Sequence, residues 1–133
     1  MLKNIVAIAI GAAFGTLLRY SLNVYTLFVG YPIGTIIENV SGSLLLGFLT
    51  GWFLCRSSKE WIKVGLGVGF CGGFTTMSTL AADFVYITSS GLLASFLYLT
   101  ISFLGGILFG LVGLMCGMKL GEKTQKPKEG ELS

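Results

Sequence analysis

Charged side chains that could handle an ion are rare in this chain, and Arg19 and Glu38 are among those that lie inside apolar stretches. Arg19 falls near the end of the first stretch and Glu38 near the start of the second. A charge within a membrane-spanning stretch is costly and usually has a partner or a function. Since the two residues lie at similar depths from the same side, the sequence predicts one of two arrangements. Either Arg19 and Glu38 form an ion pair, or Arg19 raises the local anion concentration in a vestibule.

Uncharged donors accompany these two residues. Asn39 carries an amide N–H donor, and Tyr98 and Ser102 are four residues apart, so they share one face of a helix. Ser78 and Thr79 follow a glycine-rich stretch. Together these groups could form a track of donors for an anion. Taken singly, each hydroxyl is expected to bond a carbonyl of its own helix, and the amide is expected to join two helices.

The glycine-rich stretch GFCGGFTTMSTL, residues 69–80, interrupts an apolar region. Backbone that is not helical at membrane depth is tolerated only where it is buried in protein or lines a cavity. Gly72 and Gly73 supply flexibility, and Thr75 and Thr76 can cap the helix that restarts. Freed carbonyls can coordinate a small cation, and freed N–H groups can face an anion. We therefore favour an ion site over a simple hinge.

The composition is that of a membrane protein. Of 133 residues, 53% are hydrophobic and 11% are charged, against about 25% charged in soluble domains, and the mean hydropathy is +0.84. The chain has no histidine, and Cys55, Cys71 and Cys116 are far apart. This excludes imidazole chemistry and argues against a cysteine metal site or a disulfide framework. No nucleophile–base constellation is present, so an enzyme is not predicted.

Four apolar stretches are long enough to cross a bilayer, which takes about 20 residues. The sequence predicts an all-α membrane protein whose spans cover residues 4–25, 33–54, 61–88 and 92–118. The first stretch is interpreted as a mature span, because no cleavage site follows it. The predicted organisation is one four-helix transmembrane domain over residues 1–118. A charged tail over residues 119–133 is expected to be disordered and cytoplasmic.

Basic residues are divided unequally between the two ends of these spans. The loops 24–31 and 89–91 contain no lysine or arginine. The opposite end carries Lys3, Arg56, Lys59, Lys63, Lys119, Lys123, Lys126 and Lys128. The positive-inside rule then predicts a multi-pass protein of the cell membrane with both termini in the cytoplasm.

Glycines spaced four residues apart recur along three of the spans. This spacing places a smooth groove on one helix face, which favours close contact between helices. The pairs are Gly11 and Gly15, Gly47 and Gly51, Gly106 and Gly110, and Gly113 and Gly117.

Three stretches, GAAFGTLLRY (11–20), PIGTIIENVSGSLLLG (32–47) and GFCGGFTTMSTLAAD (69–83), resemble the Fluc fluoride channels, also called the CrcB family. The resemblance extends over nearly the whole chain up to the tail. It implies a fluoride-selective channel through which cytoplasmic fluoride leaves the cell passively, which reduces fluoride toxicity. It also implies an antiparallel dimer with two pores and a third helix broken at Gly72–Thr76. The implied partners are fluoride, the lipid bilayer and a second subunit, without nucleic acid.

The resemblance also assigns residues. Backbone carbonyls of Gly72 and Thr75 match those that hold a central structural Na⁺ between the two subunits. Arg19 matches the vestibule arginine, and Asp83 matches an acidic residue that is usually glutamate. Gly106 stands where the family often has a further hydroxyl. The fluoride path is matched by Asn39, Ser78, Thr79, Tyr98 and Ser102.

Two features depart from the family pattern. The usual TTFSTF is TTMSTL here, so Met77 and Leu80 replace two phenylalanines of the fluoride path. Neither replacement offers the positive ring edge that can face an anion. The one-sided loop charge also opposes an antiparallel dimer of identical chains, since such a dimer needs both orientations. These features favour a heterodimer with a paralogue of opposite topology.

Two alternatives remain at this point. The chain could be a non-conducting structural subunit of a heterodimeric fluoride channel, because both phenylalanines are absent. A small multidrug-type proton-coupled antiporter has the same size and helix number. That class needs a carboxylate in the first span, where this chain has Arg19 instead.

Overall fold

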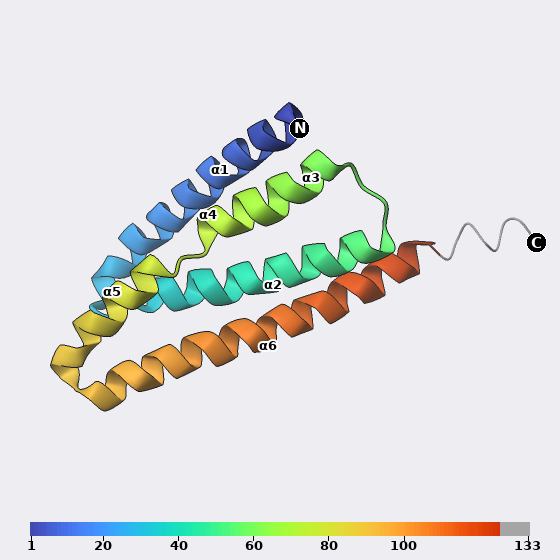
Figure 1. Ribbon diagram of the computed structural model, residues 1–133. Coiled ribbons are helices and arrows are strands. Elements are labelled where there is room, and N and C mark those ends of the chain that lie inside the picture. The colour runs from blue at the N-terminus through green and yellow to red at the C-terminus, as the bar shows by residue number, and fades with distance from the viewer. Residues whose placement is uncertain (126–133) are drawn as a thin grey trace, which may run out of the picture.

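Helices make up nearly all of residues 1–125, the part of the chain that the computed structural model describes (Figure 1). The helices are α1 (Leu2–Thr26), α2 (Ile33–Cys55), α3 (Glu60–Val64), α4 (Gly72–Phe74), α5 (Ser78–Ile87) and α6 (Leu92–Gln125). A π-helical segment, Gly65–Cys71, lies between helices α3 and α4. No strand occurs within the described residues.

Four segments are long and apolar enough to cross a membrane, as predicted. They are Leu2–Val29, Ile33–Cys55, Glu60–Ser90 and Leu92–Thr124. The third is composite, because α3, the π-helical segment, α4 and α5 follow one another within it. The four-span prediction is therefore confirmed.

The last helix is longer than the sequence predicted. We expected the final span to end at Met118 and a disordered tail to follow, but α6 continues to Gln125. No proline occurs between residues 92 and 126, and Gly121 packs closely against Cys55 at the end of α2. Residues 119–125 are thus helical, and the rest of the expected tail, 126–133, lies outside the described residues.

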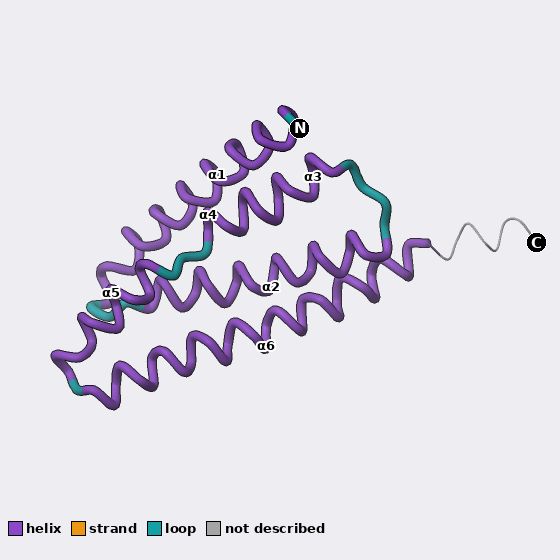
Figure 2. The backbone as a smooth tube through the Cα atoms, in the orientation of Figure 1, coloured by secondary structure: helices purple, strands orange, loops and turns teal. Residues whose placement is uncertain are grey.

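Helices α2 and α6 run side by side (Figures 1 and 2). A Cβ atom at Gly47 would overlap the carbonyl of Gly110, and one at Gly113 would overlap the carbonyl of Leu44. Gly117 approaches the Phe48 carbonyl in the same way. The predicted role of these glycines in close helix contact is confirmed.

Helix α1 forms a second pair with the first half of the third span. A Cβ atom at Gly11 would overlap the carbonyl of Gly65, and one at Gly15 would overlap the carbonyl of Phe70. From the other side, a Cβ atom at Gly69 would lie 2.7 Å from the Ile8 carbonyl oxygen. Glycines from both partners thus bring this pair into backbone contact.

A small core fixes α5 against α6 beyond the break. It consists of Leu80, Ile87 and Tyr98, with Ile36, Ala94 and Leu99 packed around it. The Ser95 hydroxyl donates to the Phe84 carbonyl at 3.1 Å, and the Phe84 and Phe96 rings meet edge to face. These contacts set the direction of α5 after the break.

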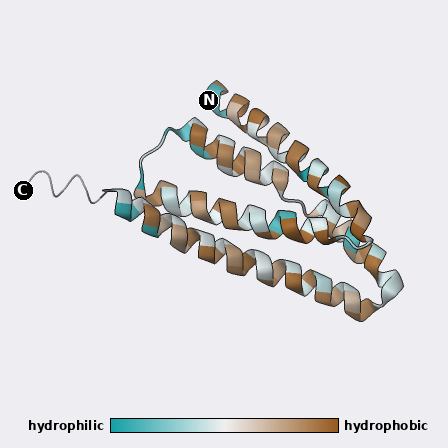
Figure 3. Cartoon of the chain, turned by 180° about the vertical axis from the view of Figure 1, so that it is seen from behind, coloured by the Kyte–Doolittle hydropathy of each residue, from teal (hydrophilic) through white to brown (hydrophobic). Residues whose placement is uncertain are grey.

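Most residues along the helices are apolar (Figure 3), and many large apolar side chains are exposed. In the most apolar window of each span, between 6% and 28% of the residues are buried within the chain. A chain of this kind must cover the rest with lipid or with a second protein, since exposed apolar patches of this extent are not stable in water.

The two ends of the molecule differ in charge. The N-terminus, the α2–α3 loop and the far end of α6 lie at one end, and the α1–α2 and α5–α6 turns lie at the other (Figure 1). Lys3, Lys59 and Lys119 therefore gather at a single end, as the sequence predicted.

Candidate functional site

The third span is interrupted at residues 75–77, where it bends by 19° (Figure 2). Helix α4 ends at Phe74, and Thr75 is extended, with φ −82° and ψ 155°. The prediction of a third span broken within Gly72–Thr76 is confirmed, and the interruption falls at the end of that range, because Gly72 and Gly73 are still helical. A Cβ atom at Gly73 would lie 2.5 Å from the Ala12 carbonyl oxygen, whereas nothing lies within 4 Å at Gly72. Gly73 therefore allows close packing against α1, and Gly72 faces open space. Neither glycine forms the turn itself.

Two threonines form hydrogen bonds at the two ends of the break. The Thr75 hydroxyl and backbone N–H both donate to the Cys71 carbonyl, at 2.9 and 3.0 Å. The Thr76 hydroxyl accepts from the Thr79 N–H at 3.2 Å, which caps the start of α5. The capping prediction is confirmed for Thr76 and wrong for Thr75, which closes the preceding helix.

Asn39 of α2 connects the break to the neighbouring span. Its Nδ2 donates to the Thr76 carbonyl at 2.9 Å, and its Oδ1 accepts from the Thr76 N–H at 2.7 Å. One side-chain amide thus satisfies both backbone polar groups of Thr76, which have no helical partner at the break. An amide nitrogen carries two hydrogens, so one N–H remains for another acceptor.

A cavity of about 550 Å³ opens beside the break between α2 and α6, and is termed the break cavity. Gly42, Ser43 and Phe103 contribute to its wall. It brings together seven positions that the sequence singled out: Asn39, Gly72, Thr75, Thr76, Met77, Ser102 and Gly106.

A second cavity, of about 470 Å³, lies by the α1–α2 turn and is termed the turn cavity. Thr79 and Asp83 from α5 line it, together with Thr35 from α2 and Tyr20 from α1. Of the predicted path, Asn39, Met77 and Ser102 thus line the break cavity and Thr79 lines the turn cavity. Ser78, Tyr98 and Leu80 line neither.

Hydroxyl groups connect these two cavities. The Thr76 hydroxyl, which belongs to the break cavity, donates to Thr79 Oγ1 at 3.1 Å, and Thr79 lines the turn cavity. Ser78 Oγ lies 3.3 Å from the same Thr76 oxygen. Asn39, Thr76 and Thr79 thus form one hydrogen-bonded series from one cavity to the other, which we term the polar series.

Tyr98 and Ser102 are both buried on α6, but their protons are already engaged. The Ser102 hydroxyl donates to the Tyr98 carbonyl at 2.8 Å, so it bonds its own helix. The Tyr98 hydroxyl lies 2.8 Å from two acceptors, the Pro32 carbonyl and Asp83 Oδ2. Tyr98 therefore ties the start of α2 and the middle of α5 to α6.

Met77 and Leu80 have different surroundings, although both were predicted on one path. Met77 is 64% exposed and lines the break cavity. Leu80 is 3% exposed, belongs to the core beside Tyr98 and lines neither cavity. Since Met77 precedes the first residue of α5, the two side chains are not held on one helix face.

Arg19 and Glu38 do not meet as an ion pair in the described chain. Glu38 is fully buried, and neither of its carboxylate oxygens has a hydrogen-bond partner among residues 1–125. Arg19 is half-buried on α1 and lines neither cavity. The ion-pair prediction therefore fails within one chain.

Sequence reasoning missed Thr35, Gly42 and Ser43. Thr35 is 1% exposed and lines the turn cavity, whereas Gly42 and Ser43 line the break cavity. All three lie three or four residues from Asn39 on the same helix. Extending the helical period in both directions from Asn39 would have found them.

Comparisons with known proteins give a consistent result. Residues 6–114 match the model of the family described as CrcB-like protein, Camphor Resistance (CrcB). A protein of Halalkalibacterium halodurans named fluoride-specific ion channel FluC 2 is 54% identical, over 96% of each chain. Its namesake in Bacillus licheniformis is 43% identical over 96% of this chain and 97% of its own. A Lactobacillus johnsonii protein named fluoride-specific ion channel FluC 1 is 35% identical over 92% and 91%.

Proposed function

The chain belongs to the CrcB family, and from this premise we propose that it is a subunit of a fluoride-specific ion channel. In this role it lets cytoplasmic fluoride leave the cell passively and so reduces fluoride toxicity. The observation that carries the proposal is the polar series, which joins two cavities at the break of a membrane span. The relatives are named as channels, so neither the antiporter nor the non-conducting subunit is favoured, and no enzymatic role is assigned.

Fluoride in a narrow path must exchange its water for protein donors. The remaining Asn39 N–H at the break cavity is one such donor, and the exposed hydroxyl of Ser78 is another. Thr79 offers a third from the turn cavity. Tyr98 and Ser102 can donate to the anion only after they release the acceptors that they now hold. Met77 adds an apolar wall that excludes water, and Leu80 supports α5 from the core.

A second, antiparallel subunit completes the channel in this proposal. The break cavity is open on the side of Gly72, where a Cβ atom would meet nothing within 4 Å. The basic residues gather at one end, which favours one orientation for this chain and a paralogue of opposite orientation for its partner. The relatives numbered FluC 1 and FluC 2 support the existence of such pairs.

The proposed structural Na⁺ fits the chemistry of the break. The end of a helix leaves carbonyl groups without intrahelical partners, and Gly72 and Thr75 both line the break cavity. Unwound carbonyls are the donors that membrane proteins use for Na⁺. Two carbonyls from one chain are too few for a closed shell, so an equal set from the second subunit would complete it. The ion would supply a fixed positive charge between the subunits.

The proposed location is the cell membrane, with both termini in the cytoplasm. Arg19 then lies on α1 toward the outer end, where its charge would draw anions to the vestibule. The fully buried carboxyl of Glu38 lies near the same end, within α2.

Fluoride efflux from liposomes tests the function directly. One preparation contains this chain alone, and the other contains it co-expressed with any adjacent paralogue. We expect rapid efflux of fluoride, and not of chloride, from the co-expressed pair. Liposomes without protein control for leakage.

Each outcome has a defined meaning. Efflux from the chain alone would show that identical subunits suffice, and would contradict the requirement for a paralogue. Absence of efflux from both preparations, with folded dimers in each, would contradict the channel function itself.

A further inference from the structure

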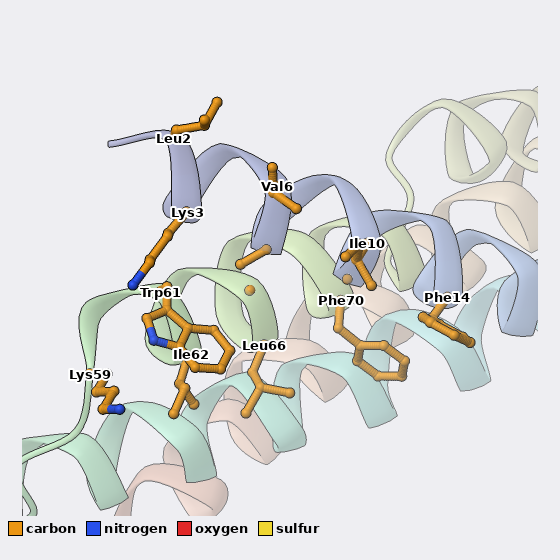
Figure 4. A pocket seen from close by; sticks show the side chains of 13 residues that line it. Leu2, Lys3, Val6, Ile10, Phe14, Lys59, Trp61, Ile62, Leu66 and Phe70 are labelled. Atoms are coloured by element: carbon orange, nitrogen blue, oxygen red, sulfur yellow. The ribbon is translucent and has the colours of Figure 1, made fainter.

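An apolar groove lies between α1 and the start of the third span, away from the break. It encloses about 980 Å³ and is termed the α1–α3 groove. Val6 and Ile10 from α1 and Leu66 and Phe70 from the π-helical segment line its length. Lys3 and Lys59 stand at one end of it (Figure 4).

The length of the groove matches one leaflet of a bilayer. Its α1 wall extends from Leu2 to Phe14, which is about 18 Å at the helical rise of 1.5 Å per residue. The hydrocarbon core of a bilayer is about 30 Å thick, so one leaflet takes about half of that. A groove that starts at the basic end of the molecule therefore reaches the middle of the membrane.

The polar end of the groove carries positive charge that is not engaged by aromatic rings. Arg56 and Lys63, two cations near the same loop, lie over the rings of Trp52 and Phe53. Lys3 and Lys59 instead border the groove, and the Trp61 ring lies beside them (Figure 4). Tryptophan at this height is typical of the lipid headgroup region, and lysine there attracts anionic headgroups.

We propose that the α1–α3 groove binds one anionic phospholipid. An acyl chain lies along Val6, Ile10, Leu66 and Phe70, and the headgroup phosphate lies between Lys3 and Lys59. A zwitterionic lipid fits the apolar walls but leaves the two lysines without a net countercharge. A helix from a second subunit also fits the walls, but its backbone offers nothing anionic at the lysine end. Charge complementarity thus selects the anionic lipid.

Native mass spectrometry of the assembled channel tests this site. The protein is titrated in detergent with phosphatidylglycerol or with phosphatidylcholine of identical acyl chains. We expect a tightly retained phosphatidylglycerol, bound at least tenfold more strongly than phosphatidylcholine. Replacing both lysines, Lys3→Gln with Lys59→Gln, should weaken this binding about thirtyfold, as expected for two lysines at a membrane surface.

A matched control removes the same charge at the same end of the molecule, but outside the groove. Lys119→Gln with Lys123→Gln should change the affinity by less than twofold. Ile10→Trp fills the groove from a position that is 53% exposed, so it should abolish retention without unfolding the protein. Val6→Trp provides a second filling variant if the first does not fold.

Four results would overturn the proposal. Equal binding of the two lipids would remove the role of the lysines, and equal effects of the two lysine pairs would indicate diffuse attraction. Retention of phosphatidylglycerol by a folded filling variant, or no retained lipid on the wild-type dimer, would show that the groove is not the site. None of these measurements depends on fluoride flux, so the proposed function is tested separately.

Discussion

At the scale of single residues, Asn39 performs a task that every broken membrane helix presents. The break leaves the N–H and C=O of Thr76 without helical partners, and water is scarce at this depth. The side-chain amide of Asn39 supplies one acceptor and one donor in the matching arrangement. In the proposed channel the same group keeps one N–H for an anion, so both stability and conduction would depend on this side chain.

Asn39→Ala should therefore affect both properties. The loss of two hydrogen bonds is expected to lower the free energy of unfolding by about 2 kcal/mol, and the loss of the donor should reduce fluoride efflux at least tenfold. Thermal unfolding in detergent and efflux from liposomes measure the two effects. Thr50→Val on the same helix is the control, because Thr50 bonds only its own helix at an exposed position. Normal efflux from a folded Asn39→Ala channel would remove this residue from the path.

Glu38 presents the opposite situation, a buried polar group without a partner. Both carboxylate oxygens are inaccessible and unbonded within residues 1–125. An unsatisfied buried polar group costs about 1–3 kcal/mol.

Glu38→Met should therefore raise the free energy of unfolding by about 1–3 kcal/mol, measured as a higher unfolding midpoint of the purified protein. Glu60→Met at an exposed position of α3 should leave the midpoint unchanged. A lower midpoint for Glu38→Met would mean that the carboxyl has a partner in the assembled channel, either Arg19 or a group from the second subunit.

At the scale of elements, the fold consists of two helix pairs held by glycine contacts. In the α2–α6 pair, the backbone of the opposite helix occupies the space that a side chain at Gly47 or Gly113 would need. Without a hydrophobic driving force between helices in lipid, such close packing is what holds spans together. The glycines of the third span serve the same purpose against α1, which explains why Gly73 remains helical.

Two glycines of α6 should respond differently to the same substitution. A Cβ atom at Gly113 would overlap the Leu44 carbonyl, whereas at Gly110 its nearest neighbour would be the Ser43 carbonyl oxygen at 3.7 Å. Gly113→Ala should lower the free energy of unfolding by about 1–3 kcal/mol through overpacking. Gly110→Ala should be neutral or slightly stabilising. Chemical denaturation in detergent compares them, and equal losses would contradict this account of the pair.

At the scale of the whole molecule, one chain leaves its polar site and most of its apolar surface uncovered. The break cavity is open beside Gly72, and the spans bury only a small share of their apolar residues internally. The basic residues at one end favour a single orientation. These properties agree with the proposed channel, in which lipid and a second subunit cover the rest of this chain.

Cysteine labelling in intact cells tests the orientation. In a chain without Cys55, Cys71 and Cys116, Lys123→Cys should react only from the cytoplasmic side and Tyr31→Cys only from outside. The reason is the excess of lysine and arginine at the end that carries Lys123. Replacing Arg56, Lys59 and Lys63 with neutral residues should make each cysteine react from both sides of the membrane. Equal labelling of Lys123→Cys from both sides of the unaltered chain would show that the charges do not fix the topology.

Several features were predictable from the sequence because they depend on local composition. Span number follows from the length of apolar runs, and the unequal ends follow from the positions of lysine and arginine. Glycines four residues apart predicted close helix contact, since the helical period alone places them on one face. The third span was predicted to be broken, because glycine and threonine cluster within it.

Other features were decided only by the tertiary structure, because they depend on which groups meet across helices. The break starts at Thr75 rather than Gly72, since contact with Ala12 and the bonds to Cys71 keep the glycines helical. Leu80 turned into the core and Glu38 was left without Arg19, which no spacing along the chain could reveal. The sequence by itself determined the spans, their charge asymmetry and the residues available as donors. Only packing between the spans decided which of those donors face a cavity and which are already bonded.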